Sequence, residues 1–552
     1  MKATQTLFLI FLCAFALRAL FIFETYEHID FRTPTPGMDI DLHWEAAGCI
    51  LEGTDPCFAL MLPSAPFFSY YLAISRSLLG DNLVWHRLLM ALFGSLTILL
   101  LALVTMRLTK SLIASCVVGI LCATLPSLLY FNTMLHKVSL NLFFLCLALS
   151  LLLSIVEDGK EEKRGRYQWL TGLCLFLAAI NQQSALLWFI PAIAFIHLTG
   201  RNHSHIRTTR ASLWFFFTLA LALLFFLPMN STKGHQHFWP QSGIHIRIGF
   251  NPNATGFYNP LPDIPNHPLG HVFVARIQAQ KELGSTLTPA EANRYHLGVA
   301  FNYIQQNPYE ALKQVSRKAL LFFNNAEIKG VEYLKYIQSQ IWLLKLPSPG
   351  FGSIFILALL GILGLIRKKK WRSLLLLGGT LFMVMVANLL TFVTWRYRLP
   401  AIIPLAVCSG IGLDFIWVEI VRKRHRQSLY LSLAIVLLGC VTTFLPILSQ
   451  ETKDKFLRLA TGNSQRRLTK ENFQNEIALL NSKPKLLLDE EVERIFYYIS
   501  IKHHSKAFRE LELLGDRASA SSKAKHLYQT YQLYQLWLGQ TSIQSPRQPR
   551  SP

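Results

Sequence analysis

Charged side chains are scarce in this chain. Asp, Glu, Lys and Arg make up 16% of its 552 residues, hydrophobic residues make up 52%, and the mean hydropathy is positive. Soluble domains carry about 25% charged residues, so this composition excludes an ordinary soluble enzyme. Acids are rarer still, 32 against 54 Lys and Arg, which leaves a formal net charge of +22. We therefore predict an all-α protein that crosses a membrane several times.

Two other patterns are missing, and each absence removes a class of protein. No stripe of Lys and Arg interleaved with aromatic residues occurs, which argues against a nucleic-acid partner. No Cys or His pattern has zinc-ligand spacing, and seven of the nine cysteines lie inside apolar runs, where Cys behaves as a small hydrophobe. Cys49 and Cys57 share the first loop instead, and could pair if that loop faces an oxidising compartment.

Long apolar runs dominate what is present. A spanning helix needs about 20 mostly apolar residues, and we predict about eleven of them. The runs lie near residues 5–23, 83–106, 112–131, 139–156, 168–181, 183–199, 212–228, 350–366, 373–392, 399–419 and 428–447. Only Asn181, Gln182 and Gln183 separate the fifth run from the sixth, so this pair could instead be a broken or re-entrant hairpin.

The basic residues predict how these helices are oriented. If the crossings alternate, nineteen Lys and Arg lie on the side of the N-terminus and three lie in the short loops opposite. By the positive-inside rule, the N-terminus is cytoplasmic and the C-terminus extracytoplasmic, in the cell (inner) membrane. We predict a transmembrane domain over 1–447, and an extracytoplasmic helical region with a disordered tail over 448–552. The outer loops of the first domain are 24–82 and 229–348.

Local signals predict helices inside both outer loops. In the first loop we expect two interfacial helices, 41–52 and 66–79, the second of which is aromatic and amphipathic. In the long loop, Thr288 followed by Pro289 and Glu291 is typical of a helix N-terminus. That helix should run to about Gln306, where Asn307-Pro308 breaks it, and a second helix should end near Phe323.

The first outer loop carries a run of carboxylates. Asp39, Asp41 and Glu45 follow Gly37 within eight residues, and the loop as a whole has nine acidic residues against two basic ones. Ionised groups at a membrane surface are costly to hold in place and indicate a site. The alternative is structural, because Asp favours helix N-caps and a helix could begin near Leu42.

Three cations are expected on the same side of the membrane. Arg396 and Arg398 flank Tyr397 at a predicted water boundary, where guanidinium groups suit a phosphate. Lys137 opens the fourth apolar run from the same side. The alternative for the arginines is that they only extend from the helix end toward water.

Four segments carry motifs that point to a known family. They are Asp39 through His43 to Ala46-Ala47, Pro66-Phe67-Phe68-Ser69-Tyr70, Gln241 to Tyr258 with its Gly-Phe-Asn-Pro-Asn-Ala-Thr-Gly, and Arg396-Tyr397-Arg398-Leu399-Pro400. Together they resemble the GT-C class of polyprenyl-phosphate-sugar-dependent glycosyltransferases, which includes protein O-mannosyltransferases and the bacterial aminoarabinose transferase. The resemblance covers roughly residues 1–420 and is nearest to a bacterial branch of glycosyltransferase family 39.

The resemblance implies a GT-C fold and the transfer of a sugar from a polyprenyl-phosphate donor to an extracytoplasmic lipid, glycan or protein. Such a transfer needs a base for the acceptor hydroxyl and cations for the departing phosphate. We expect Asp39 to be the base of an inverting reaction, with Asp41 as the alternative base or as a ligand of a divalent cation. Arg396, Arg398 and Lys137 are the expected donor-phosphate ligands.

The substrate cleft is expected to include Tyr397, Asn251 and Gly256. The last two belong to a Gly/Asn/Pro segment that could cover the acceptor or could be a purely structural turn.

Two positions depart from the family pattern. His136-Lys137 stands where the family often has a glutamate near the start of the fourth helix, and Gln182-Gln183 stands where Arg-Pro is usual. These departures keep open an inactive scaffold of envelope assembly. A lipid or glycan transporter is the other alternative, although few ionisable residues lie well inside apolar runs, chiefly Arg18 and Asp414.

Overall fold

The computed structural model describes residues 3–26, 39–52, 66–157, 161–200, 213, 216–224, 242–261, 264, 271, 275–285, 287–330, 332–422 and 426–465. This described part is helical, and its one β-type pairing is an isolated parallel bridge between Phe257 and Val393. The prediction of an all-α protein is therefore confirmed. Cys57 and residues 466–552, which include most of the predicted C-terminal region, lie outside the described residues.

The membrane bundle and the segments at its ends are built from short and long helices. In chain order they are α1 (Ala3–Glu24), α3 (Asp39–Glu52), α5 (Pro66–Leu79), α6 (Leu83–Thr109), α7 (Leu112–Thr124), α8 (Pro126–Phe131), α9 (Lys137–Glu157), α10 (Glu161–Asn181), η1 (Gln183–Trp188), α11 (Phe189–Gly200), α13 (Ser242–Gly249), α14 (Ala275–Leu283), α15 (Pro289–Gln306), α16 (Pro308–Phe323), α17 (Leu334–Gln340), α18 (Trp342–Lys345), α19 (Phe351–Arg367), α20 (Trp371–Leu390), η3 (Leu399–Ala401), α21 (Ile402–Arg422), α22 (Arg426–Phe444) and α23 (Gln450–Gln465).

Five helices of the described part are long and apolar enough to span a membrane, namely α1, α6, α9, α20 and Leu399–Glu419 of η3 and α21. Shorter apolar helices are α7, η1 with α11, α19 and α22. Helices occupy ten of the eleven predicted spans, and the other, 212–228, is described only at 213 and 216–224. The chain is a multi-pass membrane protein.

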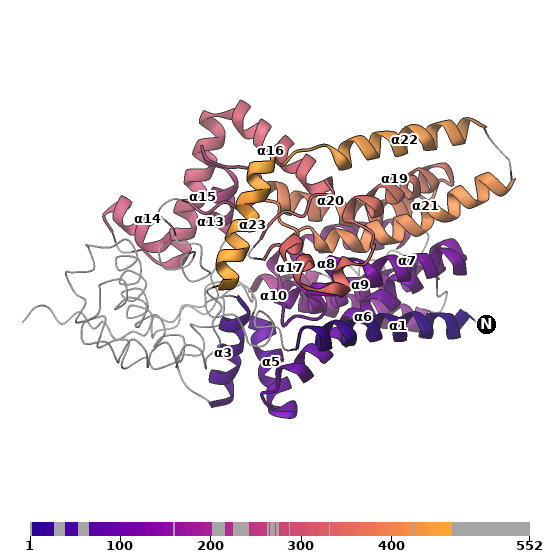
Figure 1. The fold of residues 1–552 in the computed structure, drawn as a ribbon, viewed down its shortest axis with the longest axis horizontal. Helices are drawn as coiled ribbons and strands as arrows, with labels where there is room; N and C mark the ends of the chain where they lie inside the picture. The colour runs from indigo at the N-terminus through magenta and orange to yellow at the C-terminus, as the bar shows by residue number, and fades with distance from the viewer. Residues whose placement is uncertain are drawn as a thin grey trace, which may run out of the picture.

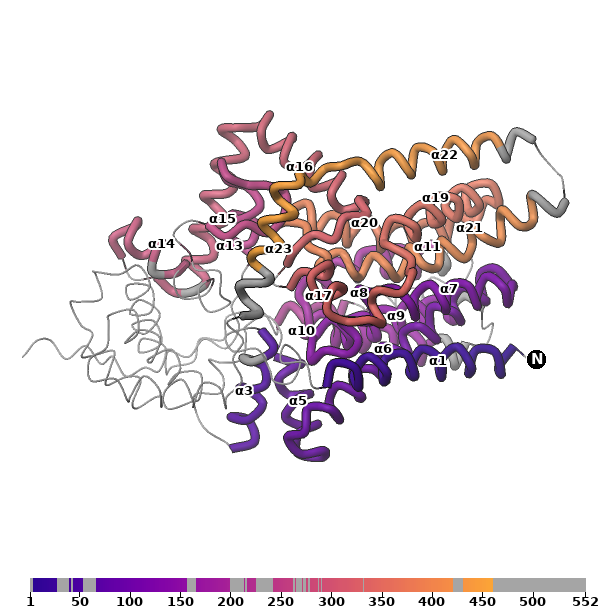
Figure 2. Tube along the Cα trace, in the orientation of Figure 1, coloured from indigo at the N-terminus to yellow at the C-terminus, as the bar shows by residue number. Residues whose placement is uncertain are grey.

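The long helices run side by side, and the predicted outer segments gather at one end of them. Figure 1 shows α1, α6, α7, α19, α21 and α22 lengthwise, with the N-terminus at one end of the bundle. The chain trace in Figure 2 shows α3 and α5 at the opposite end, with α13, α14, α15 and α23 near the same end. Both outer loops thus contribute helices to one end of the bundle, as alternating crossings require.

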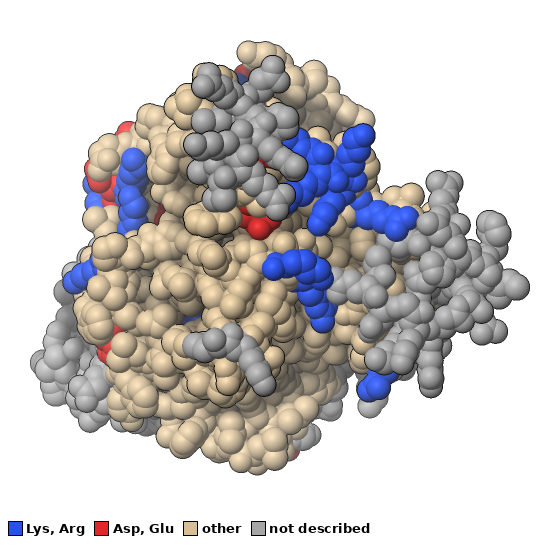
Figure 3. All heavy atoms as spheres, turned by 90° about the vertical axis from the view of Figure 1, so that its right-hand side faces the viewer, with Lys and Arg blue, Asp and Glu red and all other residues tan. Residues whose placement is uncertain are grey.

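The opposite end of the bundle carries exposed basic residues. Figure 3 looks at this end, and blue Lys and Arg side chains gather on it. Exposed basic residues at this end include Lys110, Lys368 and Lys369 between helices and Arg372 in the first turn of α20. Lys110 ends α6 in the left-handed conformation with φ of 58°, and its N–H donates to the Met106 carbonyl. The clustering of charge that the sequence predicted is therefore present in the fold.

Several local predictions are confirmed. Thr288 and Glu291 form a capping box at the start of α15: each side chain accepts a hydrogen bond from the other residue's backbone N–H. Asn307 separates α15 from α16, whose first residue is Pro308. The break between the fifth and sixth apolar runs is also present, because α10 ends at Asn181 and a 3-10 helix, η1, follows before α11.

Helices α3 and α5 correspond to the two helices predicted for the first loop, and they pack against each other. Their shared apolar cluster includes Ile40 and Ala47 from α3 and Phe68 and Leu72 from α5. The Arg76 guanidinium lies 4.3 Å from the centre of the Trp44 ring and donates to the Trp44 carbonyl at 2.8 Å, which clamps the two helices together. This packing fixes the start of α3, where Asp39 lies.

The described part of the C-terminal region packs against the outer segments. Phe456 of α23 is buried and meets the rings of Phe257 and Tyr333 edge-on, at 5.1 and 5.7 Å between ring centres. The predicted boundary at residue 447 is therefore followed by a helix that docks on the first domain.

Candidate active site

Asp39 and Arg396 lie together at the end of the bundle where α3 begins. Arg396 Nη1 lies 3.2 Å from a carboxylate oxygen of Asp39, and the two side chains are 13% and 18% exposed. The same Nη1 lies 3.0 Å from Nε2 of His136. Asp39 is the first residue of α3, His136 precedes α9, and Arg396 belongs to the connection between α20 and η3. The structure thus brings together three distant parts of the chain.

The charges around Asp39 keep its carboxyl ionised. Burial by itself would raise the pKa of Asp39, but the positive charges of Arg396 and Lys137 lower it below the usual range. Conversely, burial opposes the charge on Arg396, and the Asp39 carboxylate more than offsets this and raises the Arg396 pKa. The pair is therefore a carboxylate and a guanidinium at any physiological pH.

Lys137 is held in place through its backbone and through the residues that follow α10. Asn181 Nδ2 donates to the Lys137 carbonyl at 2.7 Å. One turn along α9, Asn141 Nδ2 donates to the side-chain oxygen of Gln182 at 3.1 Å. Gln182, one of the two departures from the family pattern, thus links α10 and η1 to the helix that begins with Lys137.

His43 lies on the same face of α3 as Asp39, one turn along. It is 1% exposed, its Nδ1 lies 2.8 Å from the Ser69 hydroxyl oxygen, and its ring meets Phe68 edge-on. Burial, followed by the charge of Lys137, lowers the pKa of His43 to about 3, so the ring is neutral. Its Nε2 is buried without a hydrogen-bond partner among the described residues.

Arg398 lies apart from this cluster. Its guanidinium is 1% exposed and donates to the carbonyls of Asn324 and Ala326 at 2.6 and 2.9 Å. It also lies 3.5 Å from the carboxylate of Glu327 and 4.2 Å from the centre of the Phe351 ring. These partners occupy its hydrogen-bonding edges, so this arginine anchors the connection that carries Arg396.

Asn251 and Gly256 shape the turn that follows α13. The Asn251 amide donates to the carbonyls of Arg247 and Ile248, which closes the C-terminal end of α13. Gly256 has φ of +85°, which favours glycine, and its carbonyl accepts from the Val393 N–H at 3.0 Å. The turn is thereby attached to the segment just before Arg396.

An aromatic and histidine cluster that includes the predicted cleft residue Tyr397 lies beside the charged groups, and the sequence did not predict that its rings meet. Phe392 stacks on Tyr397 at 5.4 Å between ring centres and meets Tyr258 and His245 edge-on. The Tyr258 hydroxyl lies 3.0 Å from His271 Nε2. These rings lie near the charged pair. Burial has the largest effect on the pKa values of His245 and Tyr258, and the charges of Asp39 and Arg396 also contribute. Isolated aromatic residues in a long loop offered no periodic signal from which to predict this cluster.

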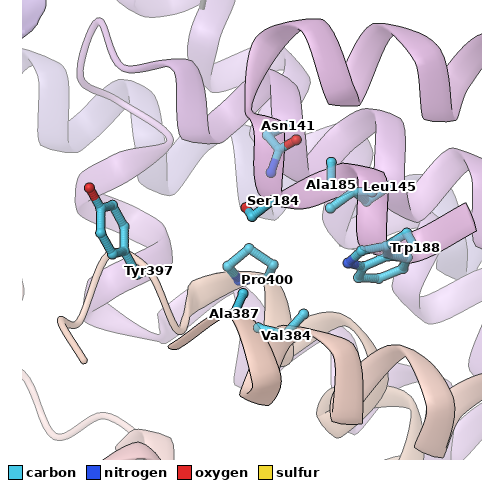
Figure 4. A pocket seen from close by; sticks show the side chains of 9 residues that line it. All are labelled: Asn141, Leu145, Ser184, Ala185, Trp188, Val384, Ala387, Tyr397 and Pro400. Atoms are coloured by element: carbon cyan, nitrogen blue, oxygen red, sulfur yellow. The ribbon is translucent and has the colours of Figure 1, made fainter. Parts of the chain in front are cut away.

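A small, mainly apolar hollow, with room for about one water molecule, lies beside Tyr397. Figure 4 shows Tyr397 on one side of it, Asn141 and Ser184 across from Pro400, and Trp188 further along. The remaining lining comes from Leu145, Ala185, Val384 and Ala387. Helix α9, the 3-10 helix η1, α20 and the connection after Arg396 thus surround one small pocket.

A divalent cation finds few ligands here. Asp39 is surrounded by Arg396, Lys137 and His136, whereas hard cations need several oxygen ligands. Among the described residues, no group of three or more His, Cys, Asp or Glu is arranged to hold a metal ion. Asp41 lies in α3, but its side chain is outside the described part of the structure.

One known protein family matches part of this chain. Residues 63–231 match the family model of dolichyl-phosphate-mannose-protein mannosyltransferase. The match confirms the resemblance to GT-C glycosyltransferases. The matched GT-C segment runs from just before α5 past α11, and so contains His136, Lys137 and Gln182. No curated protein matches the chain.

Solved structures of an archaeal enzyme show some likeness to this chain. The oligosaccharyltransferase of Archaeoglobus fulgidus, tethered with an acceptor peptide, has a TM-score of 0.46 and 17% identity, over 87% of this chain and 57% of its own. The same enzyme, AglB, with an inhibitory peptide and a dolichol-phosphate has a TM-score of 0.46 and 15% identity, over 88% and 58%. A third structure, with Zn and sulfate, has a TM-score of 0.43 and 16% identity, over 87% and 56%. The chain thus spans little more than half the length of that enzyme.

Proposed function

We propose that this chain is an integral membrane glycosyltransferase that moves a sugar from a polyprenyl-phosphate donor to an extracytoplasmic acceptor. The observation that carries the proposal is the ion pair of Asp39 and Arg396 beside Lys137, at the end of the bundle where both outer loops meet. A carboxylate next to fixed cations offers a base for an acceptor hydroxyl and charge for a departing phosphate. The family match over 63–231 supports the same chemistry.

The reaction is a single displacement. The acceptor oxygen forms a bond to the anomeric carbon of the sugar as the bond from that carbon to the phosphate oxygen breaks, and the acceptor proton passes to Asp39. Attack opposite the leaving group inverts the anomeric configuration. Positioned bases of this kind contribute about 10²–10⁴-fold to the rate.

Arg396 couples the two ends of this displacement. In the ion pair its charge lowers the pKa of Asp39 and so weakens the carboxylate as a base. When the donor phosphate draws the guanidinium toward itself, the proton affinity of Asp39 rises at the moment when the base is needed. The Lys137 ammonium adds a second cation for the same phosphate.

The other candidate residues take supporting roles in this proposal. Arg398 positions the Arg396 segment instead of contacting phosphate, because its guanidinium is already bound to Asn324, Ala326 and Glu327. Asn251 and Gly256 hold the outer turn against that segment. Asp41, two residues after Asp39, remains the alternative base, and a divalent cation is not required by the mechanism.

The apolar surface at the hollow beside Tyr397 suits the lipid part of the donor, and the hollow, which has room for about one water molecule, must widen to admit it. Its lining is mostly apolar, and it opens next to the residue that follows Arg396, so a prenyl chain there would leave its phosphate near the guanidinium. The aromatic cluster of Phe392, Tyr258 and Tyr397 would then face the sugar or the acceptor. Flat rings of this type pack well against sugar faces, which supports a substrate-binding role.

We further propose that the site faces outward from the cell (inner) membrane. The exposed basic end of the bundle in Figure 3 would face the cytoplasm, in accord with the positive-inside rule. The two residues that had suggested a transporter do not form a paired site: Asp414 lies 3.3 Å from Lys368 at the basic end, and Arg18 donates to the Ala14 carbonyl of its own helix.

Mass spectrometry of envelope glycans, lipids and glycoproteins tests the proposed function. Cells without this chain should lose one sugar modification, and wild-type protein should restore it while Asp39→Asn should not. Purified protein in vesicles should release polyprenyl phosphate only when donor and acceptor are both present. Movement of labelled lipid across vesicles without consumption of any sugar donor would favour a transporter, and unchanged glycans with no donor consumption would favour a scaffold.

A further inference from the structure

His136 has an unusual pair of neighbours. It is 3% exposed, and its ring meets Phe131 edge-on. On one side, its Nδ1 accepts from the Val138 backbone N–H at 3.2 Å. On the other side, its Nε2 faces Nη1 of Arg396 at 3.0 Å. Both neighbours are hydrogen-bond donors, and neither has a lone pair to offer the ring.

One imidazole cannot satisfy both of them. A neutral histidine carries one N–H and one lone pair, and a protonated histidine has no lone pair at all. Burial and the positive charge of Arg396 hold the pKa of His136 well below its ordinary value, so the ring is neutral with one acceptor nitrogen. Whichever tautomer forms, one of the two facing N–H groups meets another N–H. This holds without knowledge of where the hydrogen atoms lie.

The backbone decides which nitrogen keeps the lone pair. The Val138 N–H belongs to the first turn of α9, has no intrahelical acceptor and cannot move away. Arg396 is a long side chain that already has an alternative acceptor, the Asp39 carboxylate at 3.2 Å. The tautomer with the proton on Nε2 therefore fits the site best. In that tautomer the Nε2–H of His136 and the Nη1 group of Arg396 face each other as two donors, so an acceptor oxygen that drew both of them would relieve the mismatch.

We propose that His136 binds the phosphate of the polyprenyl-phosphate donor, through a hydrogen bond from Nε2–H to a phosphate oxygen that Arg396 also contacts. A phosphate oxygen can accept from both nitrogens at about 2.8 Å each once the Arg396 guanidinium turns toward the phosphate and its 3.0 Å separation from His136 Nε2 widens. A phosphate oxygen has the lone pairs that both donors lack. The inference rests on the proposed function, since it names a ligand of that same site.

A phosphate-binding role for His136 gives a reason for its departure from the family pattern. A glutamate before Lys137, as in the family pattern, would accept from Arg396 and add negative charge. Histidine at this position instead adds a donor and no negative charge. The site of this chain therefore presents Arg396, Lys137 and a neutral N–H to an anion, with the Asp39 carboxylate in contact with Arg396 and the Glu332 carboxylate also acting on it electrostatically. The departure is consistent with a working donor site rather than with an inactive scaffold.

Direct binding of undecaprenyl phosphate to the full chain in lipid nanodiscs tests the proposal without relying on turnover. His136→Leu should weaken this binding about 10-fold or more, because a hydrogen bond to a charged group is lost. His136→Gln, whose amide supplies an N–H, should stay within about threefold of wild type, and His136→Glu should bind more weakly than His136→Leu because it repels phosphate. Uncharged undecaprenol, measured beside it, reports folding and lipid binding without phosphate recognition.

A matched control is His197→Leu, at an exposed histidine near the end of α11, which should bind like wild type. Equal binding of undecaprenyl phosphate by wild type and His136→Leu would overturn this inference and leave the proposed function standing. If His136→Leu loses undecaprenol and undecaprenyl phosphate alike, the comparison of His136→Gln with His136→Glu decides: equal binding by these two overturns the inference. Wild-type protein that prefers undecaprenol to undecaprenyl phosphate would overturn both proposals.

Discussion

The Asp39 carboxylate and the Arg396 guanidinium form an ion pair 3.2 Å apart across 357 residues of sequence. The pair joins the start of an interfacial helix in the first outer loop to the connection between two late membrane helices. Each side chain is less than one fifth exposed, so removing either one leaves a poorly solvated charge behind. Substitutions of the two residues should nevertheless differ in their kinetic effects, because only Asp39 accepts the proton of the acceptor hydroxyl.

Replacing Asp39 by Asn should abolish proton transfer while leaving the donor in place. We expect turnover to fall by about two decades or more with the donor KM within about threefold, since the amide cannot act as a base. Steady-state kinetics of reconstituted protein measure both parameters. Asp41→Asn, assayed in parallel, should retain activity; the reverse result would move the base by two residues. Wild-type turnover in both variants would remove the base from this loop altogether.

Replacing Arg396 should impair both donor binding and turnover. Phosphate contacts the guanidinium in the ground state and in the transition state, so Arg396→Ala should raise the donor KM as well as lower kcat. Arg396→Lys should recover only part of the loss, because a point charge lacks the bidentate fork. The same kinetic assay checks this, and full activity of Arg396→Lys would argue against a forked phosphate contact.

Replacing Arg398 should affect the fold before it affects the donor. Removing one partner of a buried pair costs about 3–5 kcal/mol, and this arginine also holds the carbonyls of Asn324 and Ala326. Arg398→Ala should therefore lower the thermal unfolding midpoint in detergent by many degrees. The control is Lys313→Ala, which breaks an exposed pair with Glu310 and should leave the midpoint nearly unchanged. A stable Arg398→Ala with selective loss of donor affinity would instead return this residue to the phosphate site.

Lys318 should make stability depend on pH. It is fully buried in α16, its Nζ donates to the Leu389 carbonyl at 3.0 Å, and burial lowers its pKa from 10.5 to about 7. Between these two values the unfolded chain binds a proton that the folded chain does not, so stability should rise with pH from about 7 to 10.5. Lys318→Met should remove that part of the rise. Thermal midpoints from pH 6.5 to 9.5 test this, and parallel profiles for the two proteins would contradict it.

Cysteine labelling should separate the two ends of the bundle. Tyr309 in α16 is 75% exposed, and Arg372 is exposed at the start of α20. In intact spheroplasts, an impermeant maleimide should label Tyr309→Cys and spare Arg372→Cys, whereas both should react after lysis. The unmodified chain gives the background from its own cysteines. Labelling of Arg372→Cys alone in intact cells would reverse the orientation.

Much of the scaffold was determined by the sequence alone. Apolar runs of spanning length become helices because lipid offers their backbone groups no other hydrogen-bond partners. Short signals were equally direct: Thr288 with Glu291 begins α15, and Pro308 begins α16, because caps and prolines act on the residues next to them. Asp39, Arg396 and Lys137 could be selected as candidates from charge at a membrane boundary.

Only the tertiary structure decided how those candidates relate. Arg396 and Arg398 are two residues apart with the same chemistry, yet one meets Asp39 and the other meets Glu327, because the backbone between α20 and η3 turns between them. The tertiary structure also set His136 against Arg396, 260 residues away. Sequence patterns report periodicity and local geometry, whereas the partner of a single polar side chain depends on how distant helices pack.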